Sequence, residues 1–121
     1  MSPEVSQAIE AVESGYEYLL AFAAQGREPS SDDSGPSQQI RNTLNAMHDS
    51  MTVIMTTLMQ GVSSNGFNEL LSADLKKAQT ILSFVIDQEK IGSELIDNLN
   101  ASNHLRTALT DLFLLSEAKD S

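Results

Sequence analysis

The sequence predicts an all-α protein, an antiparallel four-helix bundle formed by a single domain over residues 1–121. Three observations support this prediction. Apolar residues recur at alternating steps of three and four in four separate stretches, which is the pattern of a buried helix stripe. No stretch alternates apolar and polar residues for long enough to form a strand. Apart from one linker, the connections between the stretches are short, which favours antiparallel neighbours.

The first helix is predicted at about 3–25. Ser2 is suited to the N-cap, Pro3 to the first helical position and Gly26 to the C-terminal stop. The apolar stripe of this helix comprises Val5, Ile9, Val12, Tyr16, Leu19 and Ala23. Residues 26–37 then form a flexible acidic linker, because they are rich in Ser, Pro and Gly and have almost nothing apolar to bury.

The second helix is predicted at about 37–60, with Gly61 as its stop and a turn at Asn65. Its stripe comprises Ile40, Leu44, Met47, Met51, Ile54 and Leu58. The third helix is predicted at 68–98, with a stripe that begins with Leu71, Leu75, Ala78, Leu82 and Val85.

The apolar pattern of this third helix rotates after Val85, where Glu89 occupies a stripe position. Either the helix ends near Asp87 and a new one starts, or it continues with a kink near 88–92; we expect the kinked helix. The fourth helix is predicted at 102–117, with a stripe of Leu105, Leu109 and Leu112, and the tail 117–121 is expected to fray.

Charge and composition exclude several classes of function. The chain has 7 Lys and Arg against 17 Asp and Glu, a net charge of -10, so binding to nucleic acid or to an anionic membrane surface is not expected. Cysteine is absent, and no apolar run is long enough for a membrane span. Without a basic-then-apolar leader pattern, the protein is expected to be cytoplasmic.

No catalytic motif is present, so we expect no enzyme, catalytic residue, cofactor or metal site. His48 and His104 are the only histidines, and neither belongs to a Glu-x-x-His or His-Glu-x-x-His motif. An alternative function is a phosphotransfer or signalling bundle centred on His48. The adjacent Asp49 opposes this alternative, because its charge would repel a phosphoryl group. Glu89 would be an acid or base if it were buried, but a solvated Glu89 is favoured.

A ridge of methionines is the most unusual feature. Met47, Met51, Met55 and Met59 recur every four residues, so the ridge starts in the core stripe and turns toward a flank of the helix. Methionine is flexible and polarizable, and Met55 and Met59 are therefore predicted to line a partner-binding groove. The alternative is ordinary filling of the core. A copper(I) site would need further ligands, and of the histidines only His48 is near.

The first helix carries a second informative face. Glu10, Glu13 and Glu17 lie within about 60° of one another, with no Lys or Arg inside the helix, while Tyr18 and Phe22 widen its apolar arc. We therefore expect a small acidic helical protein-binding module, a chaperone, adaptor or regulator. Its partner would be another protein that contributes an amphipathic helix with basic edges. The alternative is a structural oligomer subunit, including a homodimer.

Overall fold

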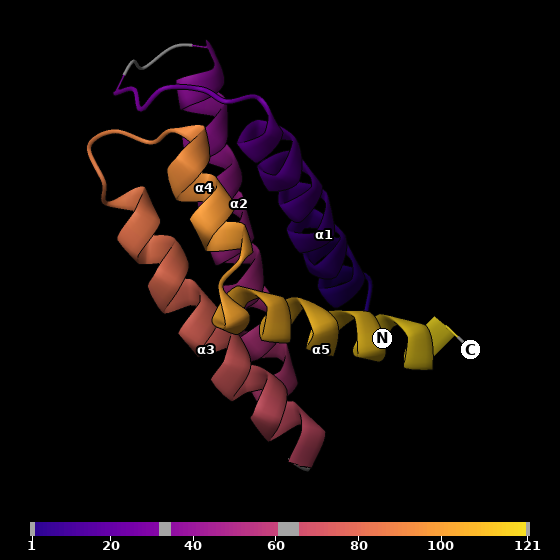
Figure 1. Cartoon of the computed structure of the whole chain (residues 1–121). Coiled ribbons are helices and arrows are strands. Elements are labelled where there is room, and N and C mark those ends of the chain that lie inside the picture. Colours follow the sequence, from indigo (N-terminus) through magenta and orange to yellow (C-terminus); the bar gives the residue numbers. More distant parts are fainter. Residues whose placement is uncertain (1, 32–34, 61–65, 121) are drawn as a thin grey trace.

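The computed structural model describes residues 2–31, 35–60 and 66–120, and it confirms that the protein is all-α. Its helices are α1 (Pro3–Ala24), α2 (Gly35–Met59), α3 (Gly66–Ile86), α4 (Ser93–Asn100) and α5 (Asn103–Asp120) (Figure 1). The described ranges contain no strand, only one isolated bridge between Ser30 and Ile91. No helix in these ranges is long and apolar enough to cross a membrane.

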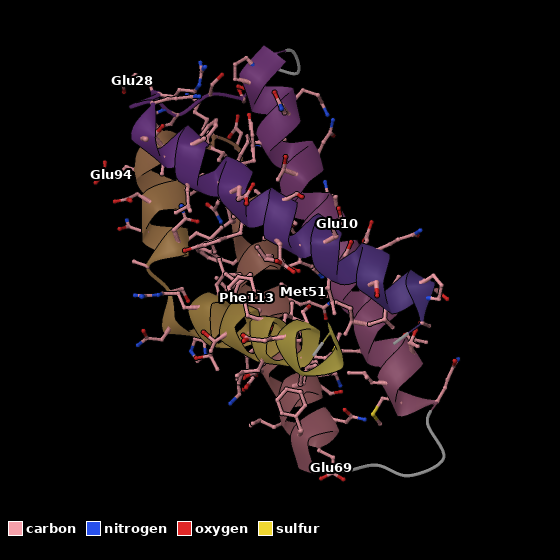
Figure 2. All side chains as sticks on the ribbon, turned by 90° about the vertical axis from the view of Figure 1, so that its right-hand side faces the viewer. Glu10, Glu28, Met51, Glu69, Glu94 and Phe113 are labelled. Carbon is pink, nitrogen blue, oxygen red and sulfur yellow. The ribbon has the colours of Figure 1, made fainter. Side chains whose placement is uncertain are left out.

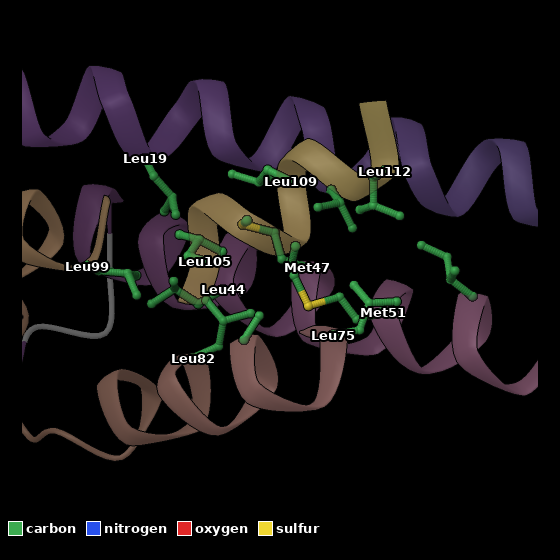
Figure 3. Packing of buried hydrophobic residues seen from close by; sticks show 14 of the residues in the cluster. Leu19, Leu44, Met47, Met51, Leu75, Leu82, Leu99, Leu105, Leu109 and Leu112 are labelled. Carbon is green, nitrogen blue, oxygen red and sulfur yellow. The ribbon is translucent and has the colours of Figure 1, made fainter. Parts of the chain in front are cut away.

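The helices form two layers. α2 packs between α1 and α3, which do not contact each other within the described residues. α4 and α5 lie on the other side, where each contacts both α1 and α3. Figure 1 shows α1 to α4 running in alternating directions, with α5 crossing below α4 and α1. The space between the layers holds the apolar core, part of which is drawn in Figure 3.

The predicted stripes supply this core. Every residue of the second and third predicted stripes is buried except Leu58, which is partly buried. Two polar contacts then attach α4 to the C-terminal part of α1: Ser93 Oγ donates to the Phe22 carbonyl at 2.6 Å, and Asn100 Nδ2 donates to the Leu19 carbonyl at 3.1 Å. These contacts give a further donor to main-chain oxygens in the last turns of α1, where the Phe22 carbonyl also accepts from the Gln25 amide at 3.2 Å.

The prediction of one helix over 68–98 is wrong. α3 ends at Ile86 and α4 begins at Ser93, so the rotated apolar pattern marks a new helix rather than a kink. Glu89 lies in the connection and is exposed, in line with the solvated alternative. α5 starts one residue after the predicted fourth helix and continues to Asp120.

Arg41 of α2 explains why α3 stops. Its guanidinium donates hydrogen bonds to the carbonyls of Ile86 at 3.0 Å, Gln88 at 2.8 Å and Glu89 at 2.7 Å. In a continuous helix these oxygens would accept from amides four residues further along the chain. The arginine replaces those partners, so the chain can leave the helix with its carbonyls still hydrogen-bonded.

The first part of the predicted linker over 26–37 is hydrogen-bonded to the connection between α3 and α4. Ser30 and Ile91 exchange two main-chain hydrogen bonds, of 3.4 and 3.1 Å. The Arg27 carbonyl accepts from the Ser93 amide at 2.9 Å. Flexibility of the linker stays a prediction, and residues 32–34 and the predicted turn at Asn65 lie outside the described residues.

Candidate partner-binding surfaces

The methionine ridge divides into a buried and an accessible half. Met47 and Met51 are fully buried in the core, as Figure 3 shows. Met55 is half-buried, and Met59 is 67% exposed. The two outer methionines belong to an open hollow of about 450 Å³ between α2 and α3, which we call the Met hollow. It is lined by Thr52, Met55, Thr56, Met59, Gln60 and Lys76.

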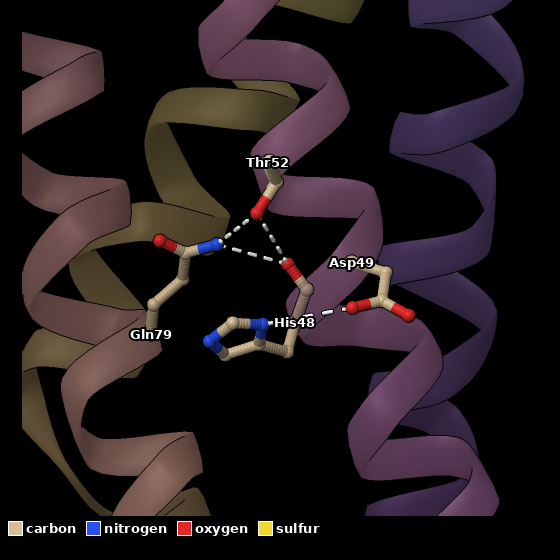
Figure 4. A network of polar contacts seen from close by, with 4 residues as sticks. All are labelled: His48, Asp49, Thr52 and Gln79. Atoms are coloured by element: carbon tan, nitrogen blue, oxygen red, sulfur yellow. Dashed lines mark hydrogen bonds and ion pairs between the residues drawn. The ribbon is translucent and has the colours of Figure 1, made fainter.

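A polar contact holds α2 and α3 together at the edge of the Met hollow, which Thr52 also lines. Gln79 Nε2 donates to the His48 carbonyl at 2.9 Å and to Thr52 Oγ1 at 2.8 Å (Figure 4). The His48 ring is partly exposed, and its Nδ1 lies 3.8 Å from a carboxylate oxygen of Asp49. This neighbour places an acid where an incoming phosphoryl group would approach, which disfavours the phosphotransfer alternative.

The predicted acids form a row on α1, which we call the acidic row: Glu10, Glu13 and Glu17. Glu10 and Glu17 are exposed, and Glu13 is half-buried. Burial and then the charges of Glu10 and Glu17 raise the pKa of the Glu13 carboxyl above its ordinary value. The charges of Glu10 and Glu17 therefore repel that of Glu13, and a nearby cation would relieve this repulsion.

Exposed apolar side chains lie next to the acidic row. Glu13, Tyr16 and Leu20 share an arc of about 60° on α1, and Leu20 is 47% exposed. Tyr16 borders a hollow of about 190 Å³ against α5, the α1–α5 hollow, where Phe113 is 45% exposed. This hollow is lined by Tyr16, Arg106, Leu109, Thr110 and Phe113. α1 with Glu10 and α5 with Phe113 are adjacent in Figure 2.

The two aromatic residues predicted on the other flank of α1 lie elsewhere. Phe22 is 1% exposed and belongs to the core, so it offers no accessible contact surface. Tyr18 is half-buried, with its ring centroid 6.3 Å from that of Phe22. Neither residue lines the α1–α5 hollow.

The Met hollow and the acidic row are also separate surfaces. The Met hollow lies on the α3 side of α2, whereas α1 packs on the other side of α2. An added side chain at Gly15 of α1 would meet Met47. Met59 is twelve residues beyond Met47, or about 18 Å along the helix. Met55 and Met59 at the Met hollow and the acidic row on α1 therefore lie on two separate surfaces rather than in one groove, and Phe22 lies in the core.

One pair of carboxyl groups, those of Asp74 and Asp111, was not predicted from the sequence. Asp111 of α5 is only 7% exposed, and the acid that acts on it is Asp74 of the adjacent helix α3. Its Oδ2 atom has no hydrogen-bond partner in the described part of the chain. Burial, the hydrogen bond to Asp74 and the Asp74 charge together raise the pKa of Asp111 to about 6. The sequence signal was present, because Asp111 is three residues after Ala108 and four before Leu115, both buried.

Within residues 2–31, 35–60 and 66–120, no three His, Asp or Glu side chains come close enough to hold a metal ion. Comparison with known protein families, with curated proteins and with solved structures gives no match for this chain.

Proposed function

We propose that this protein is a small acidic module that binds another protein through an amphipathic helix with basic edges. The observation that carries the proposal is the acidic row beside the exposed side chains of Leu20 and Phe113. Apolar residues of the partner would cover these side chains, and its Lys or Arg residues would lie along the acidic row. The net charge of -10 would also accelerate encounter with a basic partner. The proposal includes a cytoplasmic location and no catalytic role, both expected from the sequence.

We also infer that the fold is a four-helix bundle in which α4 and α5 together take the place of the fourth helix. α4 and α5 both contact α1 and α3, and neither contacts α2 within the described residues, so together they occupy the position diagonal to α2. The division matters for function, because α5 crosses the bundle and brings Phe113 next to Tyr16 of α1.

The Met hollow is a second candidate surface for the same function. Met59 is 67% exposed, and the hollow of about 450 Å³ can receive an apolar side chain of a partner. Methionine adapts its shape to different contacts, which suits a groove for partner helices. Each hollow has one cation in its lining, Lys76 in the Met hollow and Arg106 in the α1–α5 hollow, so it is the acidic row on α1 that favours the α1–α5 surface for the basic edge of the partner.

A titration with two model helices tests the proposal. One peptide of about 18 residues contains Leu and Lys, and its control contains Leu and Glu, so both form amphipathic helices of about five turns. Nuclear magnetic resonance spectra of amides in α1 and α5, and of methionine methyl groups, report the surface used. We expect the Leu/Lys peptide to shift signals at Tyr16, Leu20 and Phe113, with an affinity that falls as salt is added.

Variants of single charges provide the controls. Glu13→Lys should weaken binding of the Leu/Lys peptide about tenfold at low salt, which corresponds to about 1.4 kcal/mol. Glu94→Lys, an exposed acid on α4, should leave the affinity within about twofold. Shifts confined to the methyl groups of Met55 and Met59 would move the proposed surface to the Met hollow and reject the α1–α5 surface. Equal binding of both peptides, or binding of neither, would overturn the proposal.

A further inference from the structure

The pair of Asp74 and Asp111, which we call the carboxyl pair, joins α3 to α5. Asp111 is almost fully buried where α5 packs on α3, its Oδ2 atom has no hydrogen-bond partner in the described part of the chain, and Asp74 is the acid beside it on α3. Ionised carboxylates only accept hydrogen bonds, so two neighbouring carboxyl groups can bond to each other only while the pair holds a proton. With both groups ionised, the two charges repel each other, and one of them is buried.

We propose that the carboxyl pair is a pH-sensitive clamp that holds α5 on α3 while it is protonated and loosens α5 when both groups are ionised. The clamp regulates the α1–α5 hollow, because Phe113 lies two residues from Asp111 on the same helix and lines that hollow with Tyr16. This consequence for partner binding rests on the proposed function. The clamp itself rests only on the contact between α3 and α5.

The charged groups around the pair determine where it titrates. Asp74 is the charged group that raises the pKa of Asp111. Lys77 of α3 and His104 of α5 line a cleft of about 270 Å³ together with Asp74, so they face the Asp74 side of the pair. α1 and α4 also pack against α5, and their acids include Glu13, Glu94 and Asp97. None of these three contributes to the shift of Asp111.

The sign of the effect follows from the folded and unfolded pKa values of Asp111. The pKa rises from 3.8 to about 6 on folding, so the folded protein binds the proton more tightly. The clamp is therefore fully effective below about pH 4 and is lost as the pH rises through about 6. The difference of about two pKa units allows up to about a hundredfold change in the equilibrium constant for detachment of α5 from α3.

Hydrogen exchange measured residue by residue tests the clamp without any partner. We expect protection factors of α5 amides to fall at least about tenfold between about pH 5 and about pH 7.5, while those in the centres of α1 and α2 change little. Asp111→Asn should abolish this dependence, because an asparagine amide donates to Asp74 at every pH. Asp74→Asn serves the same purpose if Asp111→Asn does not fold, and Asp97→Asn on α4 is the matched control.

Several results would overturn the clamp. These are protection of α5 that does not change with pH, an unchanged pH dependence in both carboxyl-pair variants, and a loss spread equally over all helices. Titration with the Leu/Lys peptide at both pH values separates this inference from the proposed function. If the exchange data show the clamp but no peptide binds, only the proposed function fails. If the peptide binds but exchange of α5 is independent of pH, only the clamp fails.

Discussion

Replacing Arg41 by alanine tests the reason why α3 ends at Ile86. The guanidinium of Arg41 donates to three main-chain carbonyls, two of them partly buried and the third, that of Glu89, exposed. Arg41→Ala leaves these oxygens without their donor. Water can replace the donor at the exposed carbonyl, but less well at Ile86 and Gln88.

The magnitude follows from the two partly buried bonds. A hydrogen bond from a charged group contributes about 1.5–3 kcal/mol to stability, and the half-buried position of Arg41 favours the lower end of that range. We therefore expect Arg41→Ala to lower the free energy of unfolding by about 2–3 kcal/mol. For a domain of this size that corresponds to a decrease in Tm of about 10 °C.

Urea denaturation followed by circular dichroism measures this loss, and two further variants identify its cause. Arg41→Lys retains the charge but not the planar set of donors, so it should recover only part of the stability. Lys90→Ala removes an exposed cation from the connection between α3 and α4 and should change stability by less than about 0.5 kcal/mol. A loss below about 0.5 kcal/mol in Arg41→Ala, or full stability in Arg41→Lys, would refute the argument that these bonds terminate α3.

Four other substitutions test the packing, the connection and the carboxyl pair. Met51→Ala should cost about 2–5 kcal/mol in urea denaturation, and Met59→Ala no more than about 0.5, since one side chain is fully buried and the other is 67% exposed; equal losses would contradict this. Gly92→Ala should destabilise the protein by about 1–3 kcal/mol in the same assay, because the added Cβ would lie 2.7 Å from the main-chain nitrogen of Pro29; unchanged stability would show that this contact is loose. Asp111→Asn should stabilise the protein at about pH 7.5 by up to about 3 kcal/mol and have little effect near pH 4, measured as Tm against pH; a destabilised variant at the higher pH would contradict the raised pKa.

Apolar spacing was sufficient to predict the helices and most of the core. A stripe records which side of a helix is buried, and the buried residues of α2 and α3 follow the predicted steps. In α1, Tyr16 and Ala23 of the predicted stripe are only partly buried, whereas Phe22, predicted on the flank, is buried. The end of α3 depended on Arg41, which is 45 residues away from Ile86 in sequence. No local pattern encodes that contact, so the rotated stripe remained compatible with both a kink and a break.

The candidate site was predicted less well, because a helical pattern does not identify the neighbour that covers each flank. Phe22 and Leu20 both lie on the edges of the apolar stripe of α1, yet Phe22 is buried and Leu20 is exposed. Phe22 lies beside Ser30 of the linker and Ile91 of the α3–α4 connection, and Ser93 bonds both the Phe22 carbonyl and the Arg27 amide at this end of α1.

The division of the fourth helix position links the fold to both proposals. A single straight helix packed along α1 and α3 would cover their whole facing groove. Because the chain turns between Asn100 and Asn103, α5 instead crosses this groove, which brings Asp111 to Asp74 and Phe113 to Tyr16. Asp111, which is unfavourable to bury when ionised, and Phe113, which remains exposed, are thus two residues apart on α5. A change in the charge of Asp111 is therefore transmitted to the α1–α5 hollow through less than one turn of α5.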